Sequence, residues 1–278
     1  MKEIVLSAQY LQSALSGTGG VVGNDRPHDI IVSLTTYGKR LNNVYLTIES
    51  LFQQSLKPDR ILLWIDSETD KQQIPEILRL QEKRGFEIRY MERDLGPYSK
   101  FFYTLQAYPE SLIITVDDDT LYPPDMVDML YRAWTADPTV VPCHRAHAMI
   151  KDSRGGLIPY KQWPKGQGSV EPSLLNFPTG VGGVLYFPGC FDDNILNKDL
   201  FMSICPNSDD IWLKAMTLKK GTRCRQVDDN RSYGTRFLTI EGSQAQALKR
   251  GNKSGPMSND VKLKAVWDHF DLWQSLKD

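Results

Sequence analysis

Apolar residues in the first half of the chain follow two patterns. Some are consecutive, and others recur at the three- to four-residue spacing of a helix. Continuous runs at 30–34, 60–65 and 112–116 predict buried strands. Between the first two, one helix face is predicted by the spacing of Leu41, Val44, Ile48, Leu51 and Phe52. Strands that alternate with helices favour a mostly parallel sheet covered by helices on both faces.

The same alternation continues to about residue 135. The pattern predicts a helix over 72–83, a strand over 86–91, and a helix that begins at Ser99 and stops before Pro109. Another helical stripe follows the double proline and consists of Met126, Met129, Leu130, Ala133 and Trp134. The first half therefore reads as an α/β unit that ends in a helix.

The second half has a different pattern. Its short β-like pieces are broken by Gly and Pro, which favours antiparallel strands and loops. A helix is predicted over 209–220, because two acids occupy its first turn, two lysines its last turn, and Gly221 follows. A last amphipathic helix is predicted through Trp267 and Trp273.

Composition narrows the classes of partner. The formal net charge of -1 gives no overall field that would attract nucleic acid or an anionic membrane. No apolar run is long enough to span a bilayer, and the N-terminus lacks the continuous apolar region of a signal peptide. We therefore expect a soluble, cytoplasmic protein. The four cysteines are Cys143, Cys190, Cys205 and Cys224. They form no C-x-x-C pair that would indicate a zinc site.

Three consecutive carboxylates, Asp117, Asp118 and Asp119, follow the third predicted strand. The carboxyl ends of central parallel strands are where open α/β sheets bind ligands. In extended chain Asp117 and Asp119 point to the same side and can share one cation. Mg²⁺ and Mn²⁺ take oxygen ligands, and substrate phosphates often complete their coordination. The triplet therefore predicts a metal site for a nucleotide-diphosphate substrate.

Two other interpretations of the triplet fit the sequence less well. Acids stabilise a helix N-terminus, but these acids precede the helical stripe at Met126 by several residues. A calcium loop of the EF-hand type needs Gly at its sixth position, where this chain has Tyr122. The catalytic metal site is therefore favoured.

Four segments in this order resemble the GT-A glycosyltransferases, in particular the bacterial family-2-like enzymes that build capsular and surface polysaccharides. They are SLTTYGKR, the aspartate-x-aspartate signature in VDDDTLYPPD, GVGGVLYFPG and PNSDDIWLKAM. The resemblance runs from about Ile30 to about Phe270. It implies a single GT-A domain over 1–278, with a nucleotide-sugar-binding half (29–135), an acceptor-binding half (136–278) and an N-terminal extension (1–28).

The resemblance also implies a donor site over the ends of the first strands. Its predicted residues are Thr35, Thr36, Tyr37, Asp66, Arg93, Lys100, Asp117, Asp118 and Asp119. Turn chemistry explains Tyr37 and Asp66 equally well. Lys100 begins a predicted helix, where a cation opposes the helix dipole, and this favours a functional role. Some of these enzymes add a C-terminal histidine to the metal, which implies His269; an exposed or packed histidine is the alternative.

Inverting sugar transfer needs a carboxylate that takes the proton of the acceptor hydroxyl. The resemblance places this base at Asp210, supported by Asp209, although acids in a first helical turn are stabilising without any such role. Predicted acceptor contacts are the backbone at Gly182 and Gly183 and the rings of Trp163 and Trp212; a bulged strand and core packing are the alternatives. The segment 249–260 is either a lid or a connector.

These observations predict a metal-dependent, inverting glycosyltransferase with Mn²⁺ or Mg²⁺ as cofactor. It would move a sugar from a nucleotide-diphosphate donor, with UDP expected first, to a glycan or lipid-linked glycan. The expected location is the cytoplasm, with the inner face of the membrane as the alternative. A sugar nucleotidyltransferase is less favoured, because the turn TTYGKR has one glycine where those enzymes carry a Gly-rich phosphate loop. A non-catalytic glycan- or metal-binding module on the same fold remains open.

Overall fold

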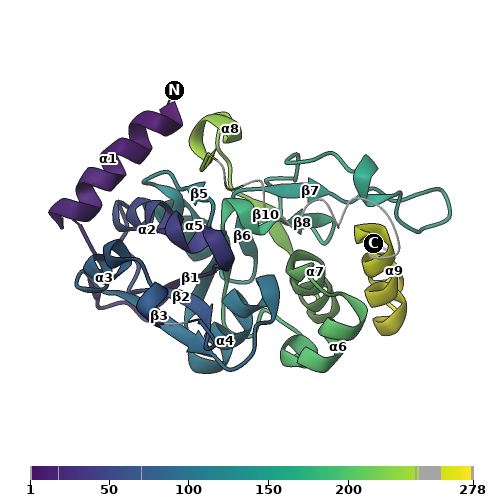
Figure 1. Ribbon diagram of the computed structural model, residues 1–278. Helices are drawn as coiled ribbons and strands as arrows, with labels where there is room; N and C mark the ends of the chain where they lie inside the picture. The colour runs from purple at the N-terminus through teal and green to yellow at the C-terminus, as the bar shows by residue number, and fades with distance from the viewer. Residues whose placement is uncertain (1, 18, 70, 242, 244–257, 277–278) are drawn as a thin grey trace.

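A seven-stranded sheet in the order β10-β6-β9-β4-β1-β2-β3 forms the centre of the protein (Figure 1). The computed structural model describes residues 2–17, 19–69, 71–241, 243 and 258–276. Four strands of the first half run parallel to one another: β1 (Ile30–Thr35), β2 (Arg60–Asp66), β3 (Phe86–Met91) and β4 (Leu112–Thr115). The predicted parallel sheet is confirmed.

The second half adds three strands to the same sheet: β6 (Val141–Cys143), β9 (Val184–Tyr186) and β10 (Cys224–Gln226). Strand β9 is antiparallel to both of its neighbours, whereas β10 runs parallel to β6. Two small antiparallel sheets pair β5 (Thr120–Leu121) with β11 (Leu238–Thr239), and β7 (Ala146–Ala148) with β8 (Asn176–Pro178). The sheet is therefore mostly parallel and draws on both halves of the chain.

Helices cover both faces of the sheet (Figure 1). One face carries α2 (Val44–Phe52), α3 (Glu76–Glu82) and α5 (Met126–Ala136). The other carries α4 (Ser99–Ala107), α6 (Lys198–Ile204), α7 (Asp209–Lys220) and α9 (Asn259–Phe270). Alternate residues of β1 point to opposite faces: Val32 packs in the α2 core, and Ile31 packs with Trp64 on the α4 side.

Several predicted boundaries differ from the structure. Helix α3 begins only at Glu76, because Pro75 stands at its N-cap. A 3-10 turn over Gly38–Asn42 precedes α2, so this helix begins later than the predicted Leu41. The last helix ends at Phe270, because Asp271 adopts the left-handed conformation.

Three further helices have no predicted counterpart, and α6 is one of them. Helix α1 (Lys2–Ser16) forms within the extension 1–28 and packs against α2 and α3 through Tyr10 and Ala14. Its outward positions include exposed apolar residues such as Ile4 and Val5, and these obscure the helical pattern in the sequence. A one-turn helix, α8 (Tyr233–Arg236), precedes β11.

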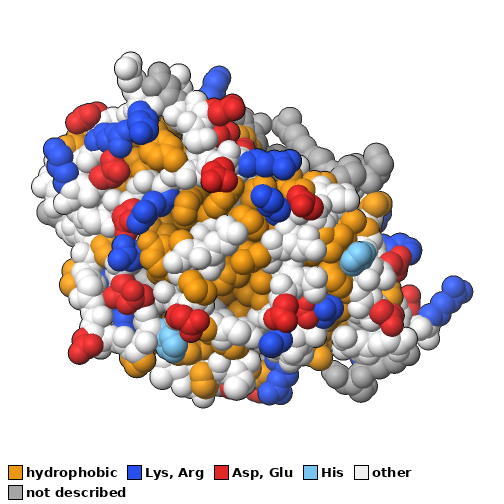
Figure 2. Space-filling model, turned by 90° about the horizontal axis from the view of Figure 1, so that it is seen from below, with side chains coloured by type: hydrophobic (Ala, Val, Ile, Leu, Met, Phe, Trp, Pro, Cys, Tyr) orange, Lys and Arg blue, Asp and Glu red, His pale blue; other side chains and the backbone are white. Residues whose placement is uncertain are grey.

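The surface carries charges of both signs. Figure 2 shows apolar side chains gathered across the middle of one face, with acidic and basic side chains interspersed around them. This mixture agrees with the near-zero net charge of the chain. Among the described residues, no helix combines the length and the apolar character that crossing a bilayer requires.

Candidate active site

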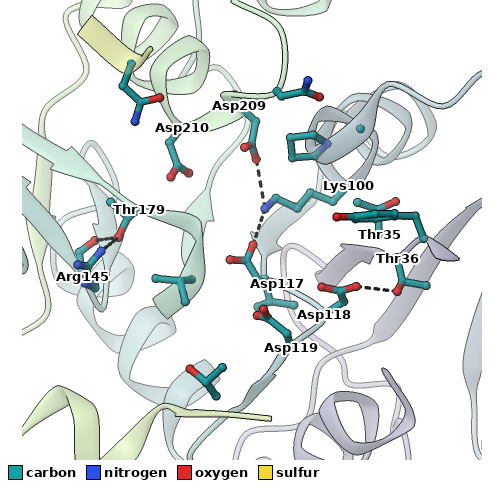
Figure 3. A pocket seen from close by; sticks show the side chains of 18 of the residues that line it. Thr35, Thr36, Lys100, Asp117, Asp118, Asp119, Arg145, Thr179, Asp209 and Asp210 are labelled. Atoms are coloured by element: carbon teal, nitrogen blue, oxygen red, sulfur yellow. Dashed lines mark hydrogen bonds and ion pairs between the residues drawn. The ribbon is translucent and has the colours of Figure 1, made fainter. Parts of the chain in front are cut away.

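A pocket of about 810 Å³ opens over the carboxyl ends of β1 and β4. Residues that follow these strands form one side of it: Thr35 and Thr36 after β1, and Asp117 to Asp119 after β4. Residues of the second half form the opposite side, among them Arg145, Thr179 and Asp210 (Figure 3). The parallel strands thus bring segments that are distant in sequence to one edge of the sheet.

The three carboxylates after β4 have different surroundings. Asp118 is buried and accepts a hydrogen bond of 2.6 Å from Thr36 Oγ1. It also forms an ion pair with Arg40. Burial raises the pKa of Asp118 to about 6, although Arg40 and Thr36 act against this rise. Arg40 also pairs with Asp119, with 3.0 Å between Nη2 and Oδ2. One arginine thus offsets two adjacent carboxylates.

Lys100, at the start of α4, is the second cation in contact with the triplet, and it is buried. Its Nζ lies 2.8 Å from Asp117 Oδ1 and 3.2 Å from Asp209 Oδ2 (Figure 3). Burial alone would lower the pKa of Lys100, but the neighbouring carboxylates outweigh burial and raise it above its ordinary value. Lys100 therefore stays charged and joins the triplet to the acidic pair of α7.

That acidic pair begins α7. Asp210 Oδ1 accepts a hydrogen bond of 2.9 Å from the backbone N–H of Gly180. A Cβ at Gly180 would lie only 3.2 Å from Lys100 Nζ and 3.3 Å from Asp210 Oδ1, so this close approach favours glycine. Burial and, next, the charge of Asp209 raise the pKa of Asp210. A carboxylate with a raised pKa is suited to general-base chemistry near neutral pH.

The pocket contains seven of the nine predicted donor residues, and Asp66 and Arg93 are the two that do not line it. The carboxylate of Asp66 accepts a hydrogen bond from the backbone of Glu68, which is the turn chemistry named as its alternative. Arg93 is exposed and contacts the hydroxyl of Tyr103 through its backbone. We withdraw donor contact for both residues.

The predicted sugar platforms are wrong for a physical reason. Trp212 is fully buried, and its indole N–H donates to the carbonyl of Ile195. Trp163 is 2% exposed and packs against Phe177. Neither ring has a free face on which a sugar could stack.

The two predicted glycines have structural explanations. A Cβ at Gly182 would lie 3.2 Å from the Cβ of Arg145, and Gly183 has a positive φ of 88° beside Met126. Neither glycine lines the pocket, so close backbone packing accounts for both. The glycine that does approach the acidic groups is Gly180, at the start of the same segment.

His269 does not meet the acidic triplet. Asn259 and Asp260, at the first turn of α9, line the pocket. His269 is exposed in the last turn of the same helix, roughly 15 Å farther along its axis at 1.5 Å per residue. We therefore withdraw it as a metal ligand. Of the predicted lid or connector, residues 249–257 lie outside the described part of the chain.

Among the residues that sequence reasoning missed are Arg40 and Arg145, which line the pocket, and Gly180, which contacts Asp210 beside it. Arg40 and Gly180 lie in SLTTYGKR and GVGGVLYFPG, two of the segments that carry the family resemblance. Their contact partners, however, are distant in sequence. Arg145 had no local signal, because its partner Thr179 lies on another strand connection. All three are identified by tertiary contacts alone.

The carboxylates fit a divalent cation that is bound together with a substrate. Asp117 and Asp119 both line the pocket, and two carboxylates plus phosphate oxygens are a common Mg²⁺ ligand set. Within the described residues there is no group of three or more His, Cys, Asp or Glu side chains that would hold a metal. Two carboxylates leave coordination positions open for phosphate oxygens, so this pair suits a metal diphosphate.

Solved structures that are similar to this chain include two of S. aureus TarS and one of a mannosyltransferase. One is residues 1–349 of S. aureus TarS in complex with UDP-GlcNAc, with a TM-score of 0.51 and 13% identity, matched over 88% of this chain and 66% of that one. Another TarS structure has a TM-score of 0.47 and 17% identity over 76% of this chain and 60% of that one. A Pyrobaculum calidifontis mannosyltransferase, PcManGT, with GDP-Man and Mn²⁺, has a TM-score of 0.44 and 15% identity over 99% of this chain and 82% of that one.

At 13% identity, the TarS structure with a TM-score of 0.51 shows the fold alone. The chain spans less than two thirds of the length of the TarS chains. No curated protein matches the chain in sequence. The model of Glycosyl transferase family 2 matches residues 31–182, which is more than half of the chain and includes β1, the acidic triplet and Gly180. The chain therefore belongs to glycosyl transferase family 2.

Proposed function

We propose that this protein is a metal-dependent, inverting glycosyltransferase. It moves a sugar from a nucleotide-diphosphate donor, with UDP as the first nucleotide to test, to a hydroxyl of a glycan or lipid-linked glycan. The proposed setting is bacterial surface polysaccharide synthesis at the cytoplasmic face of the membrane. The observation that carries the proposal is the position of Asp210, which lines the same pocket as Asp117 and Asp119 and is tied to Gly180.

The donor binds at the carboxyl ends of β1 and β4 in this proposal. Asp117 and Asp119 would hold a divalent cation, which stabilises negative charge on the departing diphosphate when it is bound. Thr35 and Tyr37 line the same side of the pocket and would contact the nucleoside. Asp118 is turned toward Thr36 and Arg40, so its role is to fix the loop that carries the other two carboxylates.

Asp210 acts on the acceptor in this mechanism. Its carboxylate takes the proton of the acceptor hydroxyl while that oxygen attacks the anomeric carbon. The Gly180 N–H fixes the orientation of the carboxylate, and the Lys100 ammonium, which is paired with Asp209, keeps the acidic pair partly neutralised. Attack from the side opposite the diphosphate gives inversion.

Among nucleotides, UDP is tested first because the TarS structure with a TM-score of 0.51 contains UDP-GlcNAc. GDP follows, because the mannosyltransferase was solved with GDP-Man and Mn²⁺. The experiment measures release of nucleoside diphosphate from a panel of sugar nucleotides, with Mn²⁺ and a mixture of glycan acceptors. Wild-type protein is compared with Asp210→Asn and with the control Asp66→Asn.

The proposal predicts turnover of at least one donor. Asp210→Asn lowers kcat by about 10²–10⁴-fold, the usual contribution of a general base, while the affinity for the nucleotide stays the same. Asp66→Asn behaves as wild type, because Asp66 lies outside the pocket. Equal turnover by Asp210→Asn and wild type would remove Asp210 as the base. No turnover of any donor by wild-type protein would contradict the proposed activity.

A further inference from the structure

We propose that the acceptor is anionic, and that a phosphate or carboxylate group on it binds Arg145 next to the catalytic carboxylate. This inference rests on the proposed function and names the class of acceptor. It follows from how cations are distributed around the pocket, from the way Arg145 is held, and from its position beside Asp210.

Cations on the two sides of the pocket differ in their partners. On the donor side, Arg40 and Lys100 each pair with two carboxylates. On the acceptor side, the pocket is lined by Arg145, Lys161 and Lys165. No carboxylate of the described residues lies within ion-pair distance of these three cations. Positive charge on the acceptor side is therefore available to a ligand.

Arg145 is held in place without an acidic partner. Its Nη1 donates a hydrogen bond of 2.9 Å to Thr179 Oγ1, and its own carbonyl accepts one of 2.9 Å from Thr179 N–H. Its guanidinium also lies 5.8 Å from the centre of the Tyr233 ring. A fixed guanidinium presents its remaining donors in the planar fork that suits phosphate and carboxylate oxygens. Such an arrangement loses little entropy when it binds an anion.

The position of Arg145 links this anion site to the reaction. Thr179, which contacts the guanidinium, directly precedes Gly180, whose N–H donates to Asp210. Successive Cα atoms are about 3.8 Å apart. An anionic group on Arg145 therefore lies in the same pocket as Asp210, beside the segment that orients this carboxylate. Figure 3 shows Arg145 and Thr179 across the pocket from Thr35, Thr36 and Lys100.

Neighbouring groups support a positive potential on this side. Burial first, and then the charges of Arg145 and Lys165, lower the pKa of His147 to about 4. His147 is thus neutral at physiological pH and adds no charge. Lys161 and Lys165 are exposed on the segment that follows Tyr160, whose N–H is tied to Asp260. They extend the positive region outward, as a chain of repeated anionic units would require.

The test compares three matched ligands on protein saturated with UDP and Mn²⁺: a neutral hexose glycoside, its uronate and its 6-phosphate. Binding is measured by calorimetry, so turnover is not needed. We expect the uronate or the phosphate to bind at least 10-fold more tightly than the neutral glycoside, with a preference that falls as salt is raised. The two charged ligands distinguish a carboxylate from a phosphate acceptor.

Variants assign the preference to the residues. Arg145→Gln removes the preference for the charged ligand, and Lys161→Gln with Lys165→Gln weakens it by a smaller factor. Arg132→Gln, a change at an exposed position of α5, is the control and retains the wild-type preference. Equal binding of all three ligands by wild-type protein would overturn the inference. So would an Arg145→Gln variant that keeps the preference, or one that weakens UDP binding instead, because Arg145 would then serve the donor.

Failure of this inference differs from failure of the proposed function. If UDP and the other nucleotides do not bind, the proposed function fails, and the three ligands are compared on protein without nucleotide. If UDP binds and the charged ligands show no advantage, the anionic acceptor alone is wrong. The circular dichroism spectrum of Arg145→Gln shows whether this variant is folded; if it is not, the exposed lysine variants decide the outcome.

Discussion

The cations on the donor and acceptor sides of the pocket have different partners. On the donor side, carboxylates are concentrated and two cations, Arg40 and Lys100, offset them. On the acceptor side, Arg145 is fixed by a hydroxyl and a ring instead of a carboxylate. The ion-paired cations of the donor side suit a site where a metal diphosphate replaces these internal ion pairs. Arg145, without a carboxylate partner, suits a site that binds an anionic ligand.

The largest expected effect is on folding stability, when the ion pair between Arg40 and Asp118 on the donor side is removed. Arg40→Met leaves the buried carboxylate of Asp118 without its ion pair, which costs about 3–5 kcal/mol of folding stability. Arg132→Met is the matched control, because Arg132 pairs with Asp128 on an exposed helix surface and its loss costs about 0–1 kcal/mol. Urea unfolding of both variants measures the difference. Equal losses in the two variants would show that Arg40 does not stabilise the triplet.

The next effect is on the rate, when a side chain is added at Gly180 between Lys100 and Asp210. Gly180→Ala places a Cβ 3.2 Å from Lys100 Nζ and 3.3 Å from Asp210 Oδ1, so these groups must move. A misplacement of about 1 Å costs on the order of 10²-fold in rate, and we expect kcat to fall toward that value. Steady-state kinetics provide the measurement. Gly234→Ala, which meets no atom within 4 Å, is the control and keeps wild-type kcat.

A smaller effect concerns stability and pH. The pKa of Asp210 is raised in the folded protein from an ordinary value of 3.8, so the charged carboxylate costs stability above that pH. Asp210→Asn removes this cost and raises the free energy of unfolding at pH 7–8 by roughly 1 kcal/mol. The gain disappears below about pH 4, where Asp210 is protonated in both states. A gain that is constant with pH would show that ionisation of Asp210 is not its cause.

The sequence predicted the donor side much better than the acceptor side. Strand ends and the Asp117–Asp119 triplet are local features, because β4 fixes where the acids emerge. The acidic pair of α7 was also visible as a helix start. Arg145, in contrast, is defined by contacts with Thr179 and Tyr233, which are distant in sequence. Local patterns cannot reveal such partners.

Three of the incorrect predictions have one cause. Trp163, Trp212 and His269 were chosen because their residue types suit sugars or metals. Residue type does not determine burial, and the two tryptophans became part of the core while the histidine came to lie at the far end of α9. The alternatives stated for these residues, core packing and an exposed helical histidine, describe them correctly. Tertiary packing decided each case.

Calorimetric titration of UDP into the protein, with and without Mn²⁺, tests the central claim most directly. The account predicts that Mn²⁺ strengthens UDP binding in wild-type protein and that Asp119→Ala abolishes this effect, while the control Asp66→Asn retains it. Equal UDP affinity with and without Mn²⁺, or an Mn²⁺ effect that persists in Asp119→Ala, would contradict a metal diphosphate held by Asp117 and Asp119.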